Sequence, residues 1–213
     1  MLEARKLCFG YPGKPAIYQG LDLQVAPGER VALRAPSGFG KTTLCQMLAG
    51  YLEPTSGQVL VDGEPLPRRG VCPVQMIWQH PEIAVDPRMR MGATLAEAGV
   101  GNGRARGLDD ASISEEHRRL LADLGIRDAW LNRYPHELSG GELQRFCIAR
   151  ALATNPRYLI ADEVSTMLDA VTQAHIWKVL LEQSERRGLG MLLVSHSPAL
   201  TERVATRVVE LGR

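Results

Sequence analysis

Hydrophobic and polar residues alternate in short stretches over the first 80 residues of the chain. Alternation with a period of two is typical of a β-strand that is buried on one face only. We expect strands at Leu21–Val25, Val31–Leu33, Val59–Val61 and Val74–Trp78. The turn pair Asp62-Gly63 closes the third of them, as in a β-hairpin. The first part of the chain is therefore predicted to be mainly β-structure.

The pattern differs after residue 155, where apolar runs and a helical period follow one another. The runs Tyr158–Ala161 and Met191–Val194 are typical of buried strands, and residues 170–186 suit an amphipathic helix between them. Residues 207–211 read as a last short strand. Strands that alternate with helices predict a parallel sheet, with functional residues at the carboxyl ends of its strands.

The stretch between these parts, residues 81–155, reads as mainly helical. Ser114 can cap a helix whose apolar face includes Leu120 and Leu124. Upstream, four glycines fall within the nine residues 99–107, and we expect a flexible surface loop there. The chain is thus predicted to insert a helical subdomain into a larger α/β fold.

Composition agrees with a globular protein and narrows the function. Of the 213 residues, 45% are hydrophobic and 23% are charged, as in average soluble chains. Lysine and arginine number 25 and aspartate and glutamate 24, so the formal net charge is +1. That balance argues against non-specific electrostatic binding to nucleic acid or to an anionic bilayer.

Two further features bear on the compartment. The sequence has no apolar run near the roughly 18 residues that a membrane-spanning helix needs, and residues 1–6 do not read as a signal peptide. The four cysteines are scattered without a Cys-x-x-Cys pair, which disfavours a disulfide framework and favours a reducing compartment. We therefore expect a cytoplasmic protein.

A glycine-rich segment lies between the expected strand 31–33 and a helical pattern that starts at Leu44. A strand, a glycine-rich turn and a helix form the setting of a phosphate-binding loop. The glycines let backbone N–H groups converge on phosphate oxygens, and the helix amino terminus adds positive potential. The residues expected to bind nucleotide here are Ser37, Gly38, Phe39, Gly40, Lys41, Thr42 and Thr43.

Two polar side chains of this loop have expected parts. Lys41 supplies a cation to the β- and γ-phosphates, and the Thr42 hydroxyl can ligate Mg²⁺. The strict pattern begins with glycine, whereas this chain has Ala35. Alanine tolerates the end of a strand when its φ is negative, so nucleotide binding is expected to survive the change. The alternative is a glycine-rich turn that joins strand to helix by chance.

Asp162 and Glu163 directly follow the expected strand 158–161. In a parallel sheet this position places both carboxylates at the carboxyl edge, beside the phosphate loop. One can hold the water shell of a metal ion while the other polarises an attacking water. Taken alone, such a pair is more often a solvated turn, so its meaning depends on the neighbouring motifs.

The segment Leu138–Arg145 is the most specific signal in the chain. Its serine hydroxyl and two glycine amides, at the start of an expected helix (roughly 141–153), make an anion site. Together with the phosphate loop and the carboxylate pair it resembles the ATP-binding cassette (ABC) ATPases. The resemblance implies that this anion site meets the γ-phosphate held by a second cassette. The residues that match the signature sequence of the family are Ser139, Gly140, Gly141 and Glu142.

The resemblance also implies parts for single residues outside these motifs. Tyr11 looks like the aromatic residue that stacks on adenine, and Gln79 looks like the glutamine that contacts the metal and the attacking water. His196 looks like the switch histidine that contacts the γ-phosphate, and Glu163 is then the general base. The implied metal site consists of Thr42, Gln79 and Asp162.

A loop after the carboxylate pair carries a further resemblance and a departure from the family. Residues 165–169 look like the loop that crosses the dimer interface, with Asp169 as its closing carboxylate. Val164 stands where the family usually has proline. We expect the change to loosen the turn without removing a chemical group.

The resemblance runs from Tyr11 to His196 and so covers nearly the whole chain. Ser139 follows Lys41 by 98 positions, a spacing that separates transport cassettes from chromosome-maintenance ATPases, which have long coiled coils between these motifs. Residues 133–137 resemble those of ATPases that serve dipeptide, oligopeptide and nickel importers. A peptide or nickel substrate is therefore expected.

The expected fold is an α/β P-loop NTPase core with a parallel sheet, an N-terminal antiparallel β subdomain and an inserted helical subdomain. One ABC ATPase domain spans residues 1–213. Residues 1–80 and 156–213 form its nucleotide-binding core with the β subdomain, and residues 81–155 form the helical subdomain with the signature. The resemblance implies an enzyme that binds ATP and Mg²⁺ and hydrolyses ATP to ADP and phosphate.

The implied partners are a second cassette, identical or different, and transmembrane permease subunits. An extracytoplasmic substrate-binding protein acts indirectly, and no nucleic acid is expected. The protein is then peripheral on the cytoplasmic face of the cell membrane. The alternative is a soluble ABC-type ATPase in DNA repair or in phosphonate or cofactor metabolism. A non-hydrolysing structural cassette is disfavoured because Gln79, Glu163 and His196 are all present.

Overall fold

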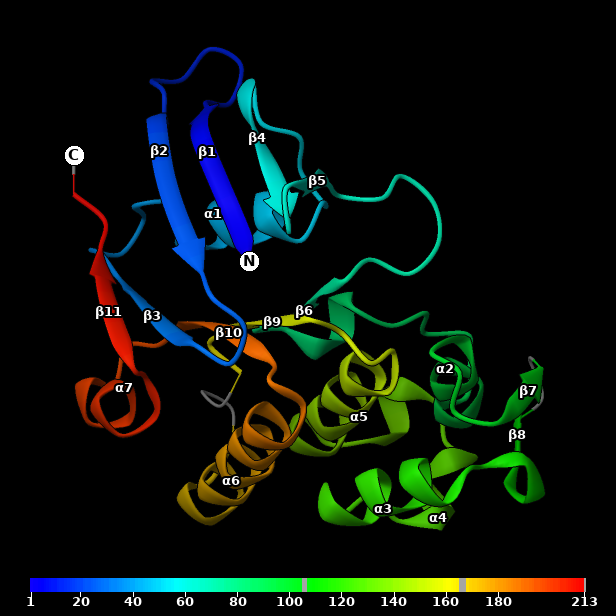
Figure 1. Ribbon diagram of the computed structural model, residues 1–213. Helices are drawn as coiled ribbons and strands as arrows, with labels where there is room; N and C mark the ends of the chain where they lie inside the picture. Colours follow the sequence, from blue (N-terminus) through cyan, green and yellow to red (C-terminus); the bar gives the residue numbers. More distant parts are fainter. Residues whose placement is uncertain (105–106, 165–167, 213) are drawn as a thin grey trace. The chain divides into compact units, whose positions relative to one another are not determined.

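The chain folds into two compact units. The computed structural model describes residues 1–104, 107–164 and 168–212 (Figure 1). The first unit consists of residues 1–76, 156–163 and 183–213, and the second consists of residues 77–155 and 164–182. The expected division into a nucleotide-binding core and a helical subdomain stays a prediction.

An antiparallel sheet forms the amino-terminal part of the first unit, drawn in blue and cyan in Figure 1. Its strand order is β2-β1-β4-β5, so β1 is paired on both sides. The strands are β1 (Leu2–Phe9), β2 (Tyr18–Val25), β4 (Ser56–Val61) and β5 (Glu64–Pro65). The strands predicted at 21–25 and 59–61 fall inside β2 and β4, and the predicted antiparallel arrangement is confirmed.

β1 has no counterpart among the predicted strands, and its irregular register gives the reason. Lys6 has a φ of +48°, and the pairing with β2 shifts between Ala4 and Leu7. The Asp22 carboxylate accepts a hydrogen bond from the Lys6 backbone N–H at 2.9 Å, which stabilises this bulge. Glu3 is buried although it is charged. A bulge and a buried charge interrupt the alternation on which strand prediction depends.

The first unit also holds a sheet in the order β11-β3-β10-β9-β6. Its strands are β3 (Arg30–Arg34), β6 (Val74–Ile77), β9 (Tyr158–Asp162), β10 (Gly190–Val194) and β11 (Arg207–Glu210). β11, β3, β10 and β9 pair in parallel, as predicted, and every residue of β9 and β10 is buried. Their carboxyl ends therefore meet at one edge of the sheet.

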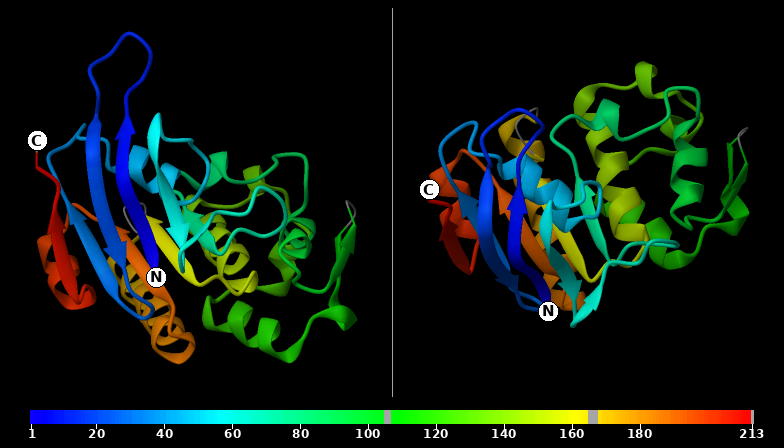
Figure 2. Two further views of the ribbon diagram at one scale, coloured as in Figure 1. Left: turned by 45° about the horizontal axis from the view of Figure 1, so that its top comes forward. Right: turned by 90° about the horizontal axis from the view of Figure 1, so that it is seen from above.

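Three helices adjoin these strands along the chain, and residues 170–182 of one of them, α6, belong to the second unit. α1 (Lys41–Leu48) follows β3, α6 (Ala170–Arg187) precedes β10, and α7 (Pro198–Val204) follows β10. α1 contacts β9 and runs beside the antiparallel sheet in the views of Figures 1 and 2. The helices predicted at 44–48 and 170–186 are confirmed, and α1 begins three residues earlier than predicted.

The second unit is mainly helical, as the sequence predicts. Ser114 caps the helix α3, and its Oγ accepts a hydrogen bond from the His117 backbone N–H at 3.2 Å. Leu120 and Leu124 are buried, also as predicted. Short 3₁₀ turns lie at Pro81–Ile83, Asp110–Ser112 and Pro135–Glu137. The helices are α2 (Met91–Glu97), α3 (Glu115–Asp123), α4 (Asp128–Leu131) and α5 (Gly140–Ala153).

The loop predicted at residues 99–107 is wrong at 102–104 and 107, which lie in strands, and residues 105–106 lie outside the described residues. β7 (Asn102–Arg104) and β8 (Gly107–Asp109) pair as a short antiparallel hairpin. The hairpin packs on α2, because a Cβ at Gly92 would lie only 2.9 Å from the Leu108 Cβ. Four glycines give no hydrophobic alternation, so the sequence carries no signal of a strand that is fixed by a neighbouring helix.

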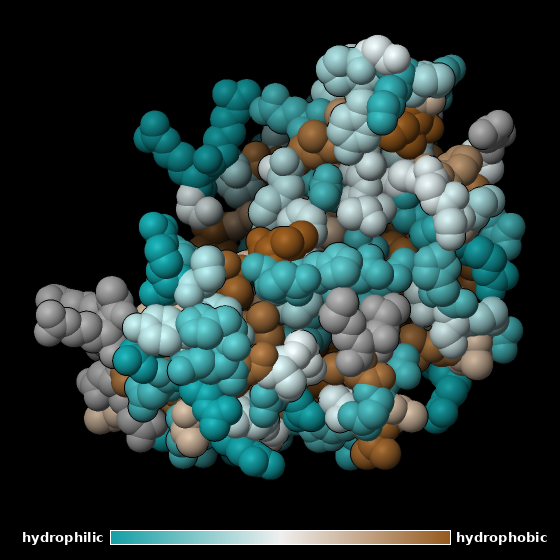
Figure 3. Space-filling model, turned by 180° about the vertical axis from the view of Figure 1, so that it is seen from behind, coloured by the Kyte–Doolittle hydropathy of each residue, from teal (hydrophilic) through white to brown (hydrophobic). Residues whose placement is uncertain are grey.

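No helix in the described ranges is long and apolar enough to cross a membrane. On the face shown in Figure 3, hydrophilic residues predominate and apolar residues lie in small groups among them. The four cysteines are free thiols, and Cys45 and Cys147 are buried.

Candidate functional site

The predicted phosphate loop connects β3 to α1. Gly38 and Gly40 have φ values of +77° and +92°, a left-handed conformation that favours glycine. Lys41 is only 8% exposed, and its Nζ donates hydrogen bonds to the backbone carbonyls of Ala35 and Pro36 at 3.0 and 3.2 Å. The loop thus closes around its own lysine. Ala35 contributes a backbone carbonyl to this closure, so its side chain is not part of it.

Tyr11 lies in the connection between β1 and β2, and 42% of it is exposed. Its hydroxyl lies 3.5 Å from the Oγ1 of Thr43 on α1. Its ring packs edge-on against Phe9, with ring centroids 5.0 Å apart. The fold therefore brings an exposed aromatic ring next to the first turn of the helix that follows the phosphate loop.

Asp162 is the last residue of β9 and is only 2% exposed. Burial raises the pKa of its carboxyl group above the ordinary value, and the neighbouring Glu163 acts in the same direction. A hydrogen bond from the Thr42 side chain and the positive charge of Lys41 act against this rise. The buried carboxylate therefore lies against two polar side chains of the phosphate loop.

Glu163 and His196 form a pair at the ends of β9 and β10. The Glu163 Oε1 lies 2.8 Å from the His196 Nε2. The Glu163 backbone has a φ of +50°, a conformation that is rare for residues other than glycine, and its N–H donates to the Val194 carbonyl at 3.0 Å. Such strain persists only where the surroundings hold it, and it is frequent at functional sites.

The carboxyl ends of three neighbouring strands thus gather one set of groups. β3 leads to Lys41 and Thr42, β9 leads to Asp162 and Glu163, and β10 leads to His196. This set offers an ammonium group, a hydroxyl, a buried carboxylate and a carboxylate–imidazole pair. Such groups can hold a phosphate chain and accept a proton from a water molecule.

The donor set also fits a divalent cation. Mg²⁺ binds in proteins through one or two carboxylates and hydroxyls, and substrate phosphates and waters complete its shell. Thr42 and Asp162, which are hydrogen-bonded to each other, supply the protein part of such a shell. Across the described ranges, no three histidine, cysteine, aspartate or glutamate residues group to hold a metal by themselves. A cation here would therefore depend on phosphate oxygens.

The predicted signature residues lie in the second unit, at the start of α5. Ser139 is the N-cap, and its Oγ accepts from the Glu142 backbone N–H at 3.3 Å. The Glu142 carboxylate accepts from the backbone N–H and Oγ of Ser139 at 2.8 and 2.9 Å, which lowers the pKa of Glu142. Gly141 is closely packed, since a Cβ there would lie 3.1 Å from the Leu168 Cδ2. Ser139 and Gly140 are exposed.

Gln79 also belongs to the second unit and is half-buried. The residue before it is held by α5, because the Gln144 Nε2 donates to the Trp78 carbonyl at 3.2 Å. Of the loop predicted to cross a dimer interface, residues 165–167 lie outside the described residues. Asp169 caps α6, and its Oδ1 accepts from the backbone N–H groups of residues 171 and 172 at 3.0 Å.

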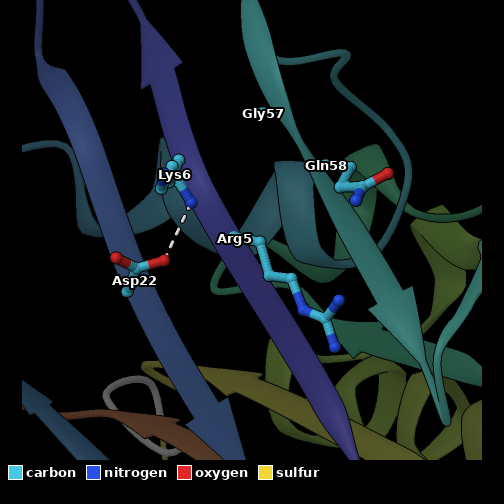
Figure 4. Close-up of a pocket in the computed structure, with 5 residues that line it drawn as sticks. All are labelled: Arg5, Lys6, Asp22, Gly57 and Gln58. Carbon is cyan, nitrogen blue, oxygen red and sulfur yellow. Dashed lines mark hydrogen bonds between the residues drawn. The ribbon is translucent and has the colours of Figure 1, made fainter.

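A separate hollow of about 420 Å³ lies on the antiparallel sheet (Figure 4), and no sequence pattern indicates it. Lys6 and Asp22, from neighbouring strands, flank it at the bulge of β1. The Nε and Nη2 of Arg5 donate to the Glu3 carboxylate at 3.0 and 2.9 Å. These contacts stabilise the sheet. The phosphate loop therefore stays the main candidate site.

Comparison with known proteins identifies the family of the chain. The sequence matches the ABC transporter family over residues 18–166. A protein of Brucella ovis named as a peptide import ATP-binding protein is 35% identical over 225 residues, which cover 99% of this chain and 69% of that protein. A glutathione import ATP-binding protein of Pectobacterium atrosepticum is 36% identical over 192 residues, which cover 85% of this chain and 30% of that protein.

Two solved structures have the same fold. One is described as the ATP binding subunit of an ABC transporter, with a TM-score of 0.81 and 27% identity over 99% of this chain and 85% of that one. The other is the ATP-binding cassette MJ0796 in a dimeric post-hydrolysis state with ADP and Pi, with a TM-score of 0.79 and 27% identity over 99% and 94%. These likenesses confirm the predicted P-loop α/β fold. The chain therefore belongs to the ABC transporter family, as one of its ATPase cassettes.

Proposed function

We propose that the chain binds ATP with Mg²⁺ at the phosphate loop, hydrolyses it to ADP and phosphate, and thereby energises a membrane importer. The observation that carries the proposal is the gathering of Lys41, Thr42, Asp162, Glu163 and His196 at the carboxyl ends of β3, β9 and β10. Five groups from three separate segments of the chain meet there, which chance does not readily produce.

In this proposal the phosphate loop holds the nucleotide. Lys41 leaves the carbonyls of Ala35 and Pro36 and donates to phosphate oxygens, because a hydrogen bond from the ammonium group to an anionic oxygen is stronger than one to a neutral carbonyl. The glycines at 38 and 40 leave room for the close approach of phosphate. Tyr11, next to Thr43, presents its ring to the adenine base.

Thr42 and Asp162 would hold Mg²⁺, which supplies positive charge to the phosphates. Gln79 is proposed as a further contact of the metal and of the attacking water, on the strength of the family resemblance.

Glu163 is proposed as the general base. Its carboxylate is oriented by the His196 Nε2 at 2.8 Å and by the held backbone at the end of β9. It accepts the proton of the water that attacks the terminal phosphorus, and His196 stays close to the phosphate oxygens. Base catalysis of this kind contributes about 10²–10⁴-fold in rate.

The signature residues Ser139, Gly140, Gly141 and Glu142 are proposed to complete the site of a second cassette. They start a helix with an exposed amino terminus, which attracts an anion. The dimeric state of the related cassette MJ0796 supports this arrangement. Hydrolysis then requires two cassettes, identical or different.

The import role is proposed from the names of the relatives. They are described as peptide and glutathione import ATP-binding proteins, so we propose a peptide-like substrate. The protein would bind permease subunits at the cytoplasmic face of the membrane. Nickel stays a prediction, and the names of these relatives do not favour the alternative of a soluble ATPase in repair or metabolism.

The enzymatic part is tested on the purified chain. Titration with Mg²⁺–ATP should show binding that Lys41→Ala abolishes, because that variant lacks the ammonium group of the loop. Release of phosphate should require Mg²⁺. Absence of ATP binding by the native chain, with its fold verified by circular dichroism, would contradict the proposal.

The import part is tested by purification from membranes with an affinity tag on this chain. Two polytopic membrane proteins should co-purify, and a strain without the chain should lose uptake of a labelled peptide. Recovery of a soluble partner in place of membrane proteins would favour the repair or metabolic alternative and leave the ATPase assignment in place.

A further inference from the structure

A second tyrosine lies at the phosphate loop, and the functions described above do not use it. Tyr18 begins β2 and is only 4% exposed. Its hydroxyl is buried and, among the described residues, has no hydrogen-bond partner. Buried polar groups in folded proteins are almost always hydrogen-bonded, so an exception calls for a physical explanation.

Tyr18 lies directly against the loop. A Cβ at Gly40 would be 3.4 Å from the Tyr18 hydroxyl oxygen and 2.5 Å from the Ile17 Cγ2. The ring of Tyr18 also packs edge-on against Phe39, with centroids 6.3 Å apart and an interplanar angle of 72°. The last two residues of the loop before Lys41 therefore lie on the start of β2.

The start of β2 is a firm support. Tyr18 pairs with Phe9 of the central strand β1, and the Ile17 N–H donates to the Phe9 carbonyl at 2.7 Å. Gly40 can approach this support only because it has no side chain, and its φ of +92° is one that glycine adopts without strain. Contacts with Ile17 and Tyr18 thus limit the position of the loop at Gly40.

The hydroxyl is a neutral donor at physiological pH. Burial raises the pKa of the Tyr18 phenol above its ordinary value, and the nearby Cys45 acts in the same direction. A neutral phenol needs an acceptor for its O–H group. Backbone carbonyls of the loop are the acceptors that a rearrangement of residues 35–40 can bring to it.

Such a rearrangement follows from the contacts of Lys41. Its ammonium group now donates to the Ala35 and Pro36 carbonyls. Phosphate oxygens compete for the same donors and form stronger hydrogen bonds, so binding of a nucleotide leaves these carbonyls without their donor. The loop carbonyls then need new hydrogen-bond donors, and the Tyr18 hydroxyl is a donor close to the loop.

We propose that Tyr18 is a positioning residue for the phosphate loop, whose ring supports Phe39 and Gly40 and whose hydroxyl donates to the loop backbone once nucleotide is bound. The inference rests on the proposed function, in which this loop binds ATP. It gives the buried hydroxyl an acceptor in the backbone of the loop.

The test is Tyr18→Phe, which removes the hydroxyl and keeps the ring. Without nucleotide the variant should unfold at the same temperature as the native chain or a higher one, because it lacks an unpaired buried group. Its dissociation constant for Mg²⁺–ADP should rise about three- to tenfold, as expected for one lost hydrogen bond. In the assembled ATPase the KM should rise while kcat stays nearly unchanged, since Tyr18 does not touch the reacting atoms.

The matched control is Tyr158→Phe. The Tyr158 hydroxyl is also buried without a hydrogen-bond partner among the described residues, but Tyr158 begins β9 at the end away from Asp162 and the loop. This variant should change the unfolding temperature only, and it should bind Mg²⁺–ADP like the native chain.

A spectroscopic measurement detects the hydrogen bond itself. With tyrosine labelled by ¹³C at Cζ, the chain gives five tyrosine signals, and Tyr18→Phe identifies the one that belongs to Tyr18. That signal should shift when Mg²⁺–ADP is added, and the Tyr158 signal should not.

The outcomes separate this inference from the proposed function. If the native chain does not bind nucleotide, the proposed function fails. If the native chain binds and Tyr18→Phe binds equally well, with no shift of the Tyr18 signal, the inference alone is overturned. Equal losses of affinity in Tyr18→Phe and Tyr158→Phe would also overturn it, because they would show a general effect of removing a buried hydroxyl.

Discussion

The phosphate-loop end of the first unit and the segment 139–142 of the second unit are built in opposite ways. The first collects Lys41, Asp162, Glu163 and His196 at the ends of three strands and buries two of them. The second takes four consecutive residues, 139–142, and leaves its N-cap exposed at the start of α5. One site is assembled by the tertiary fold, and the other is nearly complete in the local sequence.

The polar groups of the two regions also differ in how they are satisfied. In the first unit Asp162 is buried with a raised pKa, and Glu163 has a strained backbone. In the second, Ser139 and Glu142 satisfy each other in a capping box, and the pKa of Glu142 is lowered. The first region therefore contains a buried carboxylate and a strained backbone, both of which lower the stability of the fold. The second region is a satisfied helix start that offers an anion site.

The change with the largest expected effect is Glu163→Gln, which tests whether the strained end of β9 carries the chemistry. The amide keeps the size and hydrogen-bonding capacity of the carboxylate and removes the base. ATP hydrolysis should fall about 10²–10⁴-fold, while ATP binding persists because Lys41 and Thr42 are untouched. Phosphate release and nucleotide titration measure the two effects.

The same variant should form an ATP-dependent dimer on gel filtration, because two cassettes can close over ATP without resetting. Where the partner is a different cassette, the experiment is repeated with that partner. Native rates of hydrolysis by Glu163→Gln in the assembled complex would show that Glu163 is not the base.

Asp162→Asn tests whether the buried Asp162 carboxylate lowers the stability of the fold. The raised pKa means that the unfolded chain ionises first as the pH increases, so stability falls between the ordinary pKa of 3.8 and the raised value and stays lower above it. The Asn variant lacks this loss, so at neutral pH it should unfold at a higher temperature than the native chain.

The apparent affinity of Asp162→Asn for Mg²⁺ should fall about 10- to 100-fold, because the variant lacks a carboxylate of the proposed metal site. Thermal unfolding at pH 4 and pH 7 is the measurement, and the difference between variant and native should be larger at pH 7. A variant less stable than the native chain at both pH values would contradict the pKa argument.

Ser139→Ala tests the locally built site. It should lower the free energy of unfolding by about 1 kcal/mol through loss of the helix cap. ATP binding by the single chain should be unchanged, whereas hydrolysis by paired cassettes should fall about tenfold through loss of one hydrogen bond to phosphate. Ser139→Asp is the matched control, because it keeps the cap but removes the hydroxyl and adds a negative charge. Full activity of Ser139→Asp would show that the cap alone is what matters.

Ala35→Gly is expected to have the smallest effect. Ala35 faces Lys41 with its backbone carbonyl, and glycine supplies the same carbonyl. ATP affinity and turnover should stay within about twofold of the native values, since surface-type changes without a lost contact have small effects. A large gain in turnover would show that Ala35 impairs the native loop.

The sequence by itself determined every feature that depends on neighbouring residues. The cap of α3 at Ser114, the start of α5 next to Ser139 and the turn of the phosphate loop lie where the sequence predicts them, within one residue for α5. Each depends on backbone conformation and on side chains within a few positions, so one short segment contains the full cause. The long apolar runs of β9 and β10 were readable for the same reason.

Only the tertiary structure decided the features that depend on distant residues. β1 was not predicted, because its bulge is fixed by Asp22 on another strand, and the hairpin β7–β8 was not predicted, because it is held by α2 near Gly92. The approach of Tyr18 to Gly40 leaves no trace in either local pattern, since the two residues are far apart in the sequence and meet only where the loop after β3 packs against the start of β2. Burial, pKa shifts and unpaired groups arise from such contacts, and a linear pattern of hydrophobic and polar residues does not contain them.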